Sequence, residues 1–100
     1  MMSVRIVYKY PVEIVQGEQR LTVGGDPKIL HFDLNPDSLS DEPALWIEHD
    51  QNGGMHTISV FIVGTGWPLI GDPSTYKHLG TVIRPRFGGV WHLYRMVDPA

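Results

Sequence analysis

Alternating hydrophobic and polar residues predict that this chain is built from β-strands. The run 4–10 places Val4, Ile6 and Tyr8 on one face, a period of two that is typical of a half-buried strand. No stretch of ~10 or more residues has a clear helical period. The strands expected from this pattern are residues 4–10, with 12–15 as a candidate continuation, 20–23, 28–34, 44–50, 55–63, 76–84 and 90–96.

Glycine- and proline-rich segments separate these strands. Gln51-Asn52-Gly53-Gly54 has the residues of a tight hairpin turn, which predicts that 44–50 and 55–63 are antiparallel neighbours. Short strands with frequent turn signals favour an all-β fold. We expect a small β-sandwich or partly open barrel of six or seven mostly antiparallel strands, forming a single domain over residues 1–100. A rolled sheet with one short helix at 38–43 or 74–78 is the alternative.

Composition narrows the setting of the protein. The chain has no cysteine, so it forms no disulfide and no Cys-based metal site. It has no apolar run near ~18 residues, and its start lacks the pattern of a secretory signal. These features are consistent with a soluble, cytoplasmic protein that does not enter a membrane.

Charge is divided unevenly along the chain. Residues 1–66 have a net charge of −5, and residues 67–100 have a net charge of +2 from Lys77, Arg84, Arg86 and Arg95 against two acidic residues. A duplex nucleic acid needs a broad basic face, which this chain does not offer. A small basic patch could serve one phosphorylated small molecule, and the alternative is that the charges only solvate two surfaces.

The segment Gly64-Thr65-Gly66 is the most distinctive local sequence. A dinucleotide-binding loop would require a third glycine and a following helix, but Trp67-Pro68 follows and excludes the helix. Two interpretations remain: a tight turn whose backbone N–H groups bind an anion, or a turn whose glycines only supply positive φ. In either case Trp67 is placed in a turn, where stacking on a ligand or a partner is a natural role.

Other residues give no sign of metal binding or catalysis. The five histidines lie on different predicted strands without zinc-site spacing. The hydroxyls of Ser59, Thr65 and Thr81 lie in no nucleophile motif. We therefore expect no metal and no cofactor, and an enzyme is the less favoured interpretation.

Several short segments together form a fairly specific pattern that spans most of the chain. It includes the glycine-threonine-glycine motif with Pro68, and it resembles an uncharacterised family of small phage-encoded proteins. That family commonly has histidine in place of Trp67 and a shorter loop in place of 35–43. The segments are Tyr8-Lys9-Tyr10-Pro11, Lys28-Ile29-Leu30-His31, Leu45-Trp46, residues 61–66, Leu79-Gly80-Thr81 and Val90-Trp91-His92-Leu93.

The resemblance implies a phage accessory gene, and by analogy with phage proteins of this size a counter-defence role in the host cytoplasm. Our leading hypothesis is a non-enzymatic homo-oligomer that sequesters a small anionic, nucleotide-like ligand. The alternatives are a protein–protein inhibitor of a host defence or nucleic-acid enzyme, acting through the acidic loop and tryptophans, and a small hydrolase of nucleotide signals. The candidate ligand-binding residues are Gly64, Thr65, Gly66, Trp67, Tyr76, Thr81, Arg84, Arg86 and His92.

Overall fold

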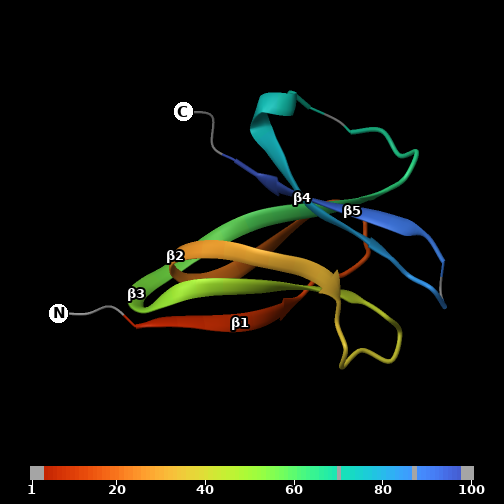
Figure 1. The fold of residues 1–100 in the computed structure, drawn as a ribbon. Helices are drawn as coiled ribbons and strands as arrows, with labels where there is room; N and C mark the ends of the chain where they lie inside the picture. Colours follow the sequence, from red (N-terminus) through yellow and green to blue (C-terminus); the bar gives the residue numbers. More distant parts are fainter. Residues whose placement is uncertain (1–3, 70, 87, 98–100) are drawn as a thin grey trace.

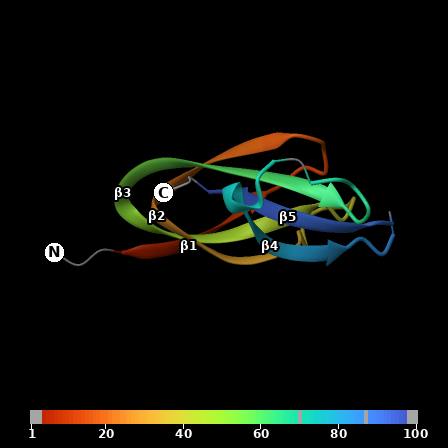
Figure 2. The same ribbon diagram turned by 90° about the horizontal axis from the view of Figure 1, so that it is seen from above.

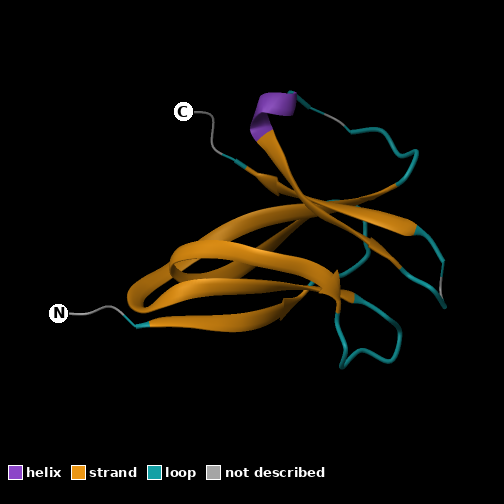
Figure 3. Ribbon diagram, viewed as in Figure 1, coloured by secondary structure: helices purple, strands orange, loops and turns teal. Residues whose placement is uncertain are grey.

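The computed structural model describes residues 4–69, 71–86 and 88–97 (Figure 1). Within these ranges five antiparallel strands form one sheet that does not close, so the expected all-β fold is confirmed (Figure 3). No helix in the described ranges is long and apolar enough to cross a membrane. The elements are β1 (Arg5–Pro11), β2 (Glu18–Leu34), β3 (Pro43–Gly64), the 3₁₀ turn η1 (Pro73–Thr75), β4 (Tyr76–Ile83) and β5 (Val90–Met96).

The long strands β2 and β3 form one extended hairpin. They pair from Glu18↔Phe61 to Leu34↔Pro43, and the loop 35–42 joins them. The prediction of a tight hairpin turn at 51–54 is therefore wrong. The chain does change direction there, but the two arms of β3, before and after this point, both pair with β2 in the described ladders and not with each other. The expected strands 20–23 and 28–34 merge into β2, and 44–50 and 55–63 merge into β3, which is why there are five strands.

Paired glycines allow this hairpin to bend in its middle. The register between β2 and β3 shifts at Gly24 and Gly25, opposite residues 50–55. A Cβ atom at Gly25 would lie 2.4 Å from the carbonyl oxygen of Gly53, and one at Gly24 would lie 2.0 Å from Nδ1 of His49. Only glycine lets the two backbones and the buried His49 ring approach this closely.

The bend creates two layers, which lie one above the other in Figure 1, and Figure 2 shows β2 and β3 bending back together. In the lower layer of Figure 1, β1 pairs with the first arm of β3, from Arg5↔Asp50 to Pro11↔Ala44. In the upper layer, β5 pairs with the second arm of β3, and β4 pairs with β5. The layers meet face to face, because a Cβ at Gly80 of β4 would touch the Phe32 ring of β2 at 3.2 Å. The core between them contains Val12, Val23, Phe32, Leu45, Ile47, Ile58, Val60, Ile62, Val82 and Leu93.

The short helix expected near 74–78 is η1. Asp72 caps this turn, since its Oδ1 accepts a hydrogen bond from the Ser74 backbone N–H at 2.9 Å. Hydrogen bonds from Ser74 lower the pKa of Asp72 below its ordinary value. The alternative position, 38–43, contains no helix.

Candidate functional site

The surface of the upper layer that points away from the core carries a cluster of three aromatic rings. Phe61 of β3 pairs with Tyr94 of β5, and because paired residues point to the same side, their rings stack with centroids 5.3 Å apart and planes 10° apart. Tyr76 of β4 meets both rings edge-on, at 5.7 Å from Phe61 and 5.4 Å from Tyr94. All three side chains are half-buried. We call this side of the β3–β5–β4 layer the upper outward face.

A hydroxyl–imidazole network lies beside these rings on the upper outward face. Oγ1 of Thr65 is 2.8 Å from Nε2 of His92, and Nδ1 of the same imidazole is 2.9 Å from Oγ1 of Thr81. Oγ1 of Thr81 is also 3.2 Å from Nε2 of His78. Ladder register explains the arrangement, because Thr81 is the cross-strand partner of His92. The network therefore runs across β4 and β5 to the turn that follows β3.

An apolar groove adjoins this network. Its volume is about 550 Å³, within the ~300–1,000 Å³ typical of small-ligand sites. Val63 belongs to the groove and is the ladder partner of His92, so the groove and the network are neighbours. The groove is lined by Gln16, Gly17, Glu18, Phe61, Ile62, Val63, Trp67, Pro68, Leu69 and Met96.

The turn after β3 sets one wall of the groove. Gly66 has φ +92°, and the Trp67 N–H donates to the Gly64 carbonyl at 3.0 Å. The Trp67 ring then lies edge-on to Trp91, with centroids 5.3 Å apart. Gly64 is required for this packing, since a Cβ there would lie 3.1 Å from the Trp67 ring and 3.3 Å from Trp91. Trp67 remains 40% exposed, which leaves part of its ring available to the groove.

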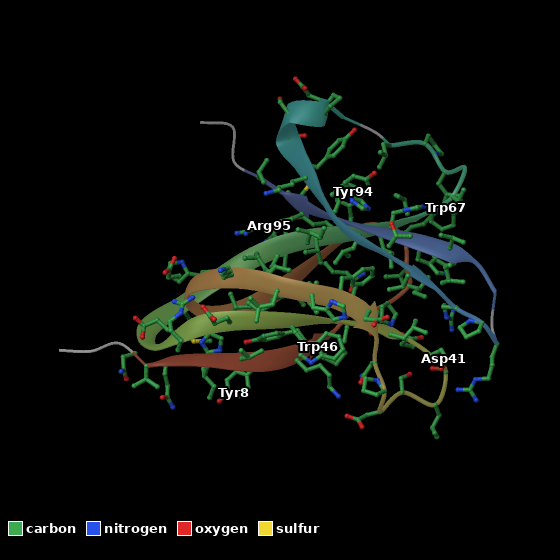
Figure 4. The ribbon with its side chains drawn as sticks, viewed as in Figure 1. Tyr8, Asp41, Trp46, Trp67, Tyr94 and Arg95 are labelled. Atoms are coloured by element: carbon green, nitrogen blue, oxygen red, sulfur yellow. The ribbon has the colours of Figure 1, made fainter. Side chains whose placement is uncertain are left out.

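The two predicted arginines lie elsewhere. Arg84 donates to the Ser40 carbonyl at 2.7 Å, and Arg86 forms two hydrogen bonds of 2.9 Å with the Asp41 carboxylate. The hydrogen bond from Arg86 lowers the pKa of Asp41, and the same bond raises the pKa of Arg86. Both arginines therefore contact the acidic loop, and Figure 4 shows Asp41 of this loop well below Tyr94 and Trp67.

The structure thus brings together most of the residues predicted for the site. Thr65, Thr81 and His92 form the network, Trp67 lines the groove, and Tyr76 joins the aromatic cluster. Gly64 and Gly66 shape the turn. Sequence reasoning missed Phe61, Val63, Met96, His78 and Tyr94. The alternation of 90–96 was the available signal, because it places His92, Tyr94 and Met96 on one side of a strand.

In the described part of the chain, no group of three or more His, Asp or Glu side chains could hold a metal ion. His78 and His92 are the two imidazoles of the network, with ring centroids 6.2 Å apart.

The amino-acid sequence matches the model of one protein family. A domain of unknown function, DUF7352, matches residues 3–100. The chain belongs to the DUF7352 family. The match to DUF7352 includes all five strands, the groove and the network. No curated protein and no solved structure matched the chain.

Proposed function

We propose that this DUF7352 protein binds and sequesters a small anionic, nucleotide-like ligand without transforming it. One observation carries the proposal: Val63, which lines the groove, is the ladder partner of His92 in the hydroxyl–imidazole network. An apolar cavity beside a few convergent polar groups is the usual composition of a small-molecule site.

The two parts of the site suit the two parts of such a ligand. A planar base would lie against Trp67 or the Phe61 and Tyr94 rings, since stacking on aromatic side chains stabilises bases by ~1–3 kcal/mol each. The anionic group would accept a hydrogen bond from the Thr65 hydroxyl, in place of the one that this hydroxyl makes with His92. This differs from the sequence-based hypothesis, which included Arg84 and Arg86 among the ligand-binding residues.

The proposal also covers the origin of the protein and its self-association. We infer a phage accessory protein that counters host defence in the host cytoplasm, on the resemblance carried by the segments around Gly64–Pro68 and Val90–Leu93. Self-association is supported by exposed apolar side chains on the upper outward face: Ile83 is 67% exposed and Met96 39%. A second copy covering this face would enclose the ligand.

The binding proposal is tested by calorimetry and thermal shift with cyclic dinucleotides and ADP-ribose derivatives. We expect low-micromolar or tighter binding to at least one of them, and weaker binding for Thr65→Val. Thr57→Val is the matched control, because it makes the same chemical change at an exposed position of β3 outside the site. Absence of binding tighter than high micromolar to every ligand would contradict the proposal. Light scattering after gel filtration measures the assembly.

Loop 35–42 favours a second candidate function, inhibition of a host protein. Hydrogen bonds from Arg84 and Arg86 hold the backbone of this loop at Ser40 and Leu39, yet the Leu39 side chain is 92% exposed. An apolar side chain presented by a rigid loop can bind a pocket at low entropic cost. If one stoichiometric host enzyme is captured and inhibited by the wild type and not by Leu39→Ser, this function replaces sequestration.

A further inference from the structure

Thr65, His92 and Thr81 have the relative positions of a hydroxyl nucleophile, its general base and a group that orients the base. Catalysis by a serine or threonine hydroxyl needs a base within ~2.6–3.2 Å, itself held by a third group. The distances here are 2.8 Å from Thr65 Oγ1 to His92 Nε2, and 2.9 Å from His92 Nδ1 to Thr81 Oγ1. Thr65 is exposed and His92 is half-buried, so a substrate can reach the hydroxyl.

The hydrogen bonds of the network can all be made in the orientation that this chemistry requires. A neutral imidazole has one N–H, so Nε2 of His92 can accept from Thr65 only if Nδ1 donates to Thr81. The Thr81 hydroxyl must then donate its own hydrogen elsewhere. Nε2 of His78 lies 3.2 Å away and can accept it. His78 and Thr81 are therefore positioning residues that favour the reactive tautomer of His92.

We propose that Thr65 is an acyl acceptor and that the protein slowly hydrolyses carboxylic esters with an apolar body. The apolar part of the ester would occupy the groove, because Val63 of the groove is the ladder partner of His92. This activity goes beyond the proposed binding function and does not depend on nucleotide affinity.

Hydrolysis of the ester proceeds through an acyl-threonine at Thr65. Oγ1 of Thr65 bonds to the ester carbonyl carbon while its proton passes to Nε2 of His92. The bond from that carbon to the alcohol oxygen breaks, and the alcohol leaves with the proton from His92. Water, deprotonated by the same imidazole, then attacks the acyl-threonine, which releases the carboxylic acid and restores the Thr65 hydroxyl.

The experiment uses p-nitrophenyl butyrate, whose acyl and aryl groups are both apolar. We expect release of p-nitrophenolate and a mass increase of one butyryl group, which tandem mass spectrometry places on Thr65. Thr65→Val should lower the rate by about a hundredfold or more. Thr65→Ser, which keeps a hydroxyl, should retain the reaction, and Thr57→Val should match the wild type. Circular dichroism confirms that each variant is folded.

Two results would overturn the assignment. One is equal release of p-nitrophenolate by the wild type and Thr65→Val. The other is a butyryl group found on a lysine or histidine and never on Thr65.

A separate measurement tests the positioning residues. Thr81→Val and His78→Phe should each lower the acylation rate by roughly tenfold and shift its pH profile, because the tautomer of His92 is no longer held. Thr81→Ser should restore both the rate and the profile. A merely structural role for Thr81 would leave the pH profile of Thr81→Val unchanged, and that result would remove the orienting step.

Discussion

The outward faces of the two layers both carry a histidine, but different groups hydrogen-bond to its ring nitrogens. On the lower layer, the ring centroids of His31 and Trp46 are 5.6 Å apart, and Nε2 of His31 is 3.2 Å from the Asp33 carboxylate. On the upper outward face, His92 is held between the hydroxyls of Thr65 and Thr81. The lower face therefore pairs its imidazole with a fixed negative charge, and the upper face pairs its imidazole with neutral groups that can donate or accept.

The surrounding residues extend this contrast. Lys9 forms an ion pair with Asp37, and Arg5 pairs with Glu48 at 3.0 Å and Asp26 at 3.3 Å, so the lower layer carries several internally compensated charges. The upper outward face instead has an aromatic cluster and borders a groove of about 550 Å³. The two faces therefore differ in chemistry: the lower face carries charges that pair with one another, whereas the upper outward face carries hydroxyl and imidazole groups beside aromatic rings. Figure 4 labels Tyr8 and Trp46 in the lower layer and Tyr94 in the upper.

The largest expected effect comes from removing the bend that separates the two faces. Gly25→Val would place side-chain atoms against the Gly53 backbone, where even a Cβ lies 2.4 Å from the carbonyl oxygen. We expect a loss of about 3 kcal/mol in the free energy of unfolding, or failure to fold. Chemical denaturation followed by circular dichroism measures it.

Gly54→Ala is the matched control for that prediction. Gly54 has φ +80° and open space around a Cβ, so the substitution costs backbone strain alone, about 1–2 kcal/mol. Equal losses for the two variants would show that the close contact of β2 with β3 does not limit the bend.

The next largest effect is expected on ligand affinity, when the same substitution is made at His92 and at His31. His92→Phe keeps a planar ring but removes both nitrogens of the network, so we expect affinity for a bound nucleotide-like ligand to fall by roughly tenfold to a hundredfold. His31→Phe makes the same change on the lower face and should leave affinity unchanged. Calorimetry on both variants decides the comparison. A larger loss for His31→Phe would move the site to the lower face.

A smaller effect is expected when the wall of the groove is displaced. Gly64→Ala would put a Cβ 3.1 Å from the Trp67 ring, which has room to move because it is partly exposed. We expect ligand affinity to fall several-fold, a shift in tryptophan emission, and at most about 1 kcal/mol lost from the free energy of unfolding. Unchanged emission and affinity would mean that Trp67 does not set the groove.

The smallest effect concerns the loop of the lower layer. The hydrogen bond from Arg86 lowers the folded-state pKa of Asp41, so this pair stabilises the protein above the unfolded-state pKa. That stability is lost as pH falls from ~4 toward the lower folded-state pKa. Asp41→Asn should therefore flatten the acid limb of the stability–pH curve slightly and leave ligand binding unchanged. Identical acid limbs in the wild type and Asp41→Asn would remove this contribution.

Hydrophobic alternation located nearly every strand, because period two is a local property that β-branched and aromatic residues express clearly. It could not reveal that 51–54 is a wide bend. The glycines of 51–54 also fit a tight turn, and the competing contact comes from Gly24 and Gly25, roughly thirty residues earlier. Local turn chemistry was thus overridden by pairing with β2.

In the candidate site, too, local sequence predicted some features, whereas contacts between distant segments decided others. Gly64, Thr65 and Trp67 were predicted as site residues because a turn needs glycine and makes an exposed aromatic residue distinctive. The distance between Thr65 and His92 depends on the register between β3 and β5, which no motif encodes. Arg84 and Arg86 were assigned to the ligand on net charge, but the acidic loop supplies their hydrogen-bond partners, a pairing that charge counting along the chain does not predict.

We propose that the ligand binds to the upper outward face and not to the lower face. Nuclear magnetic resonance of the histidine and tryptophan side chains during titration with a cyclic dinucleotide tests it most directly. We predict that the signals of His92, His78 and Trp67 move with a common saturation, while those of His31 and Trp46 stay fixed. Movement confined to His31 and Trp46, or no movement of His92 at saturating ligand, would contradict the account.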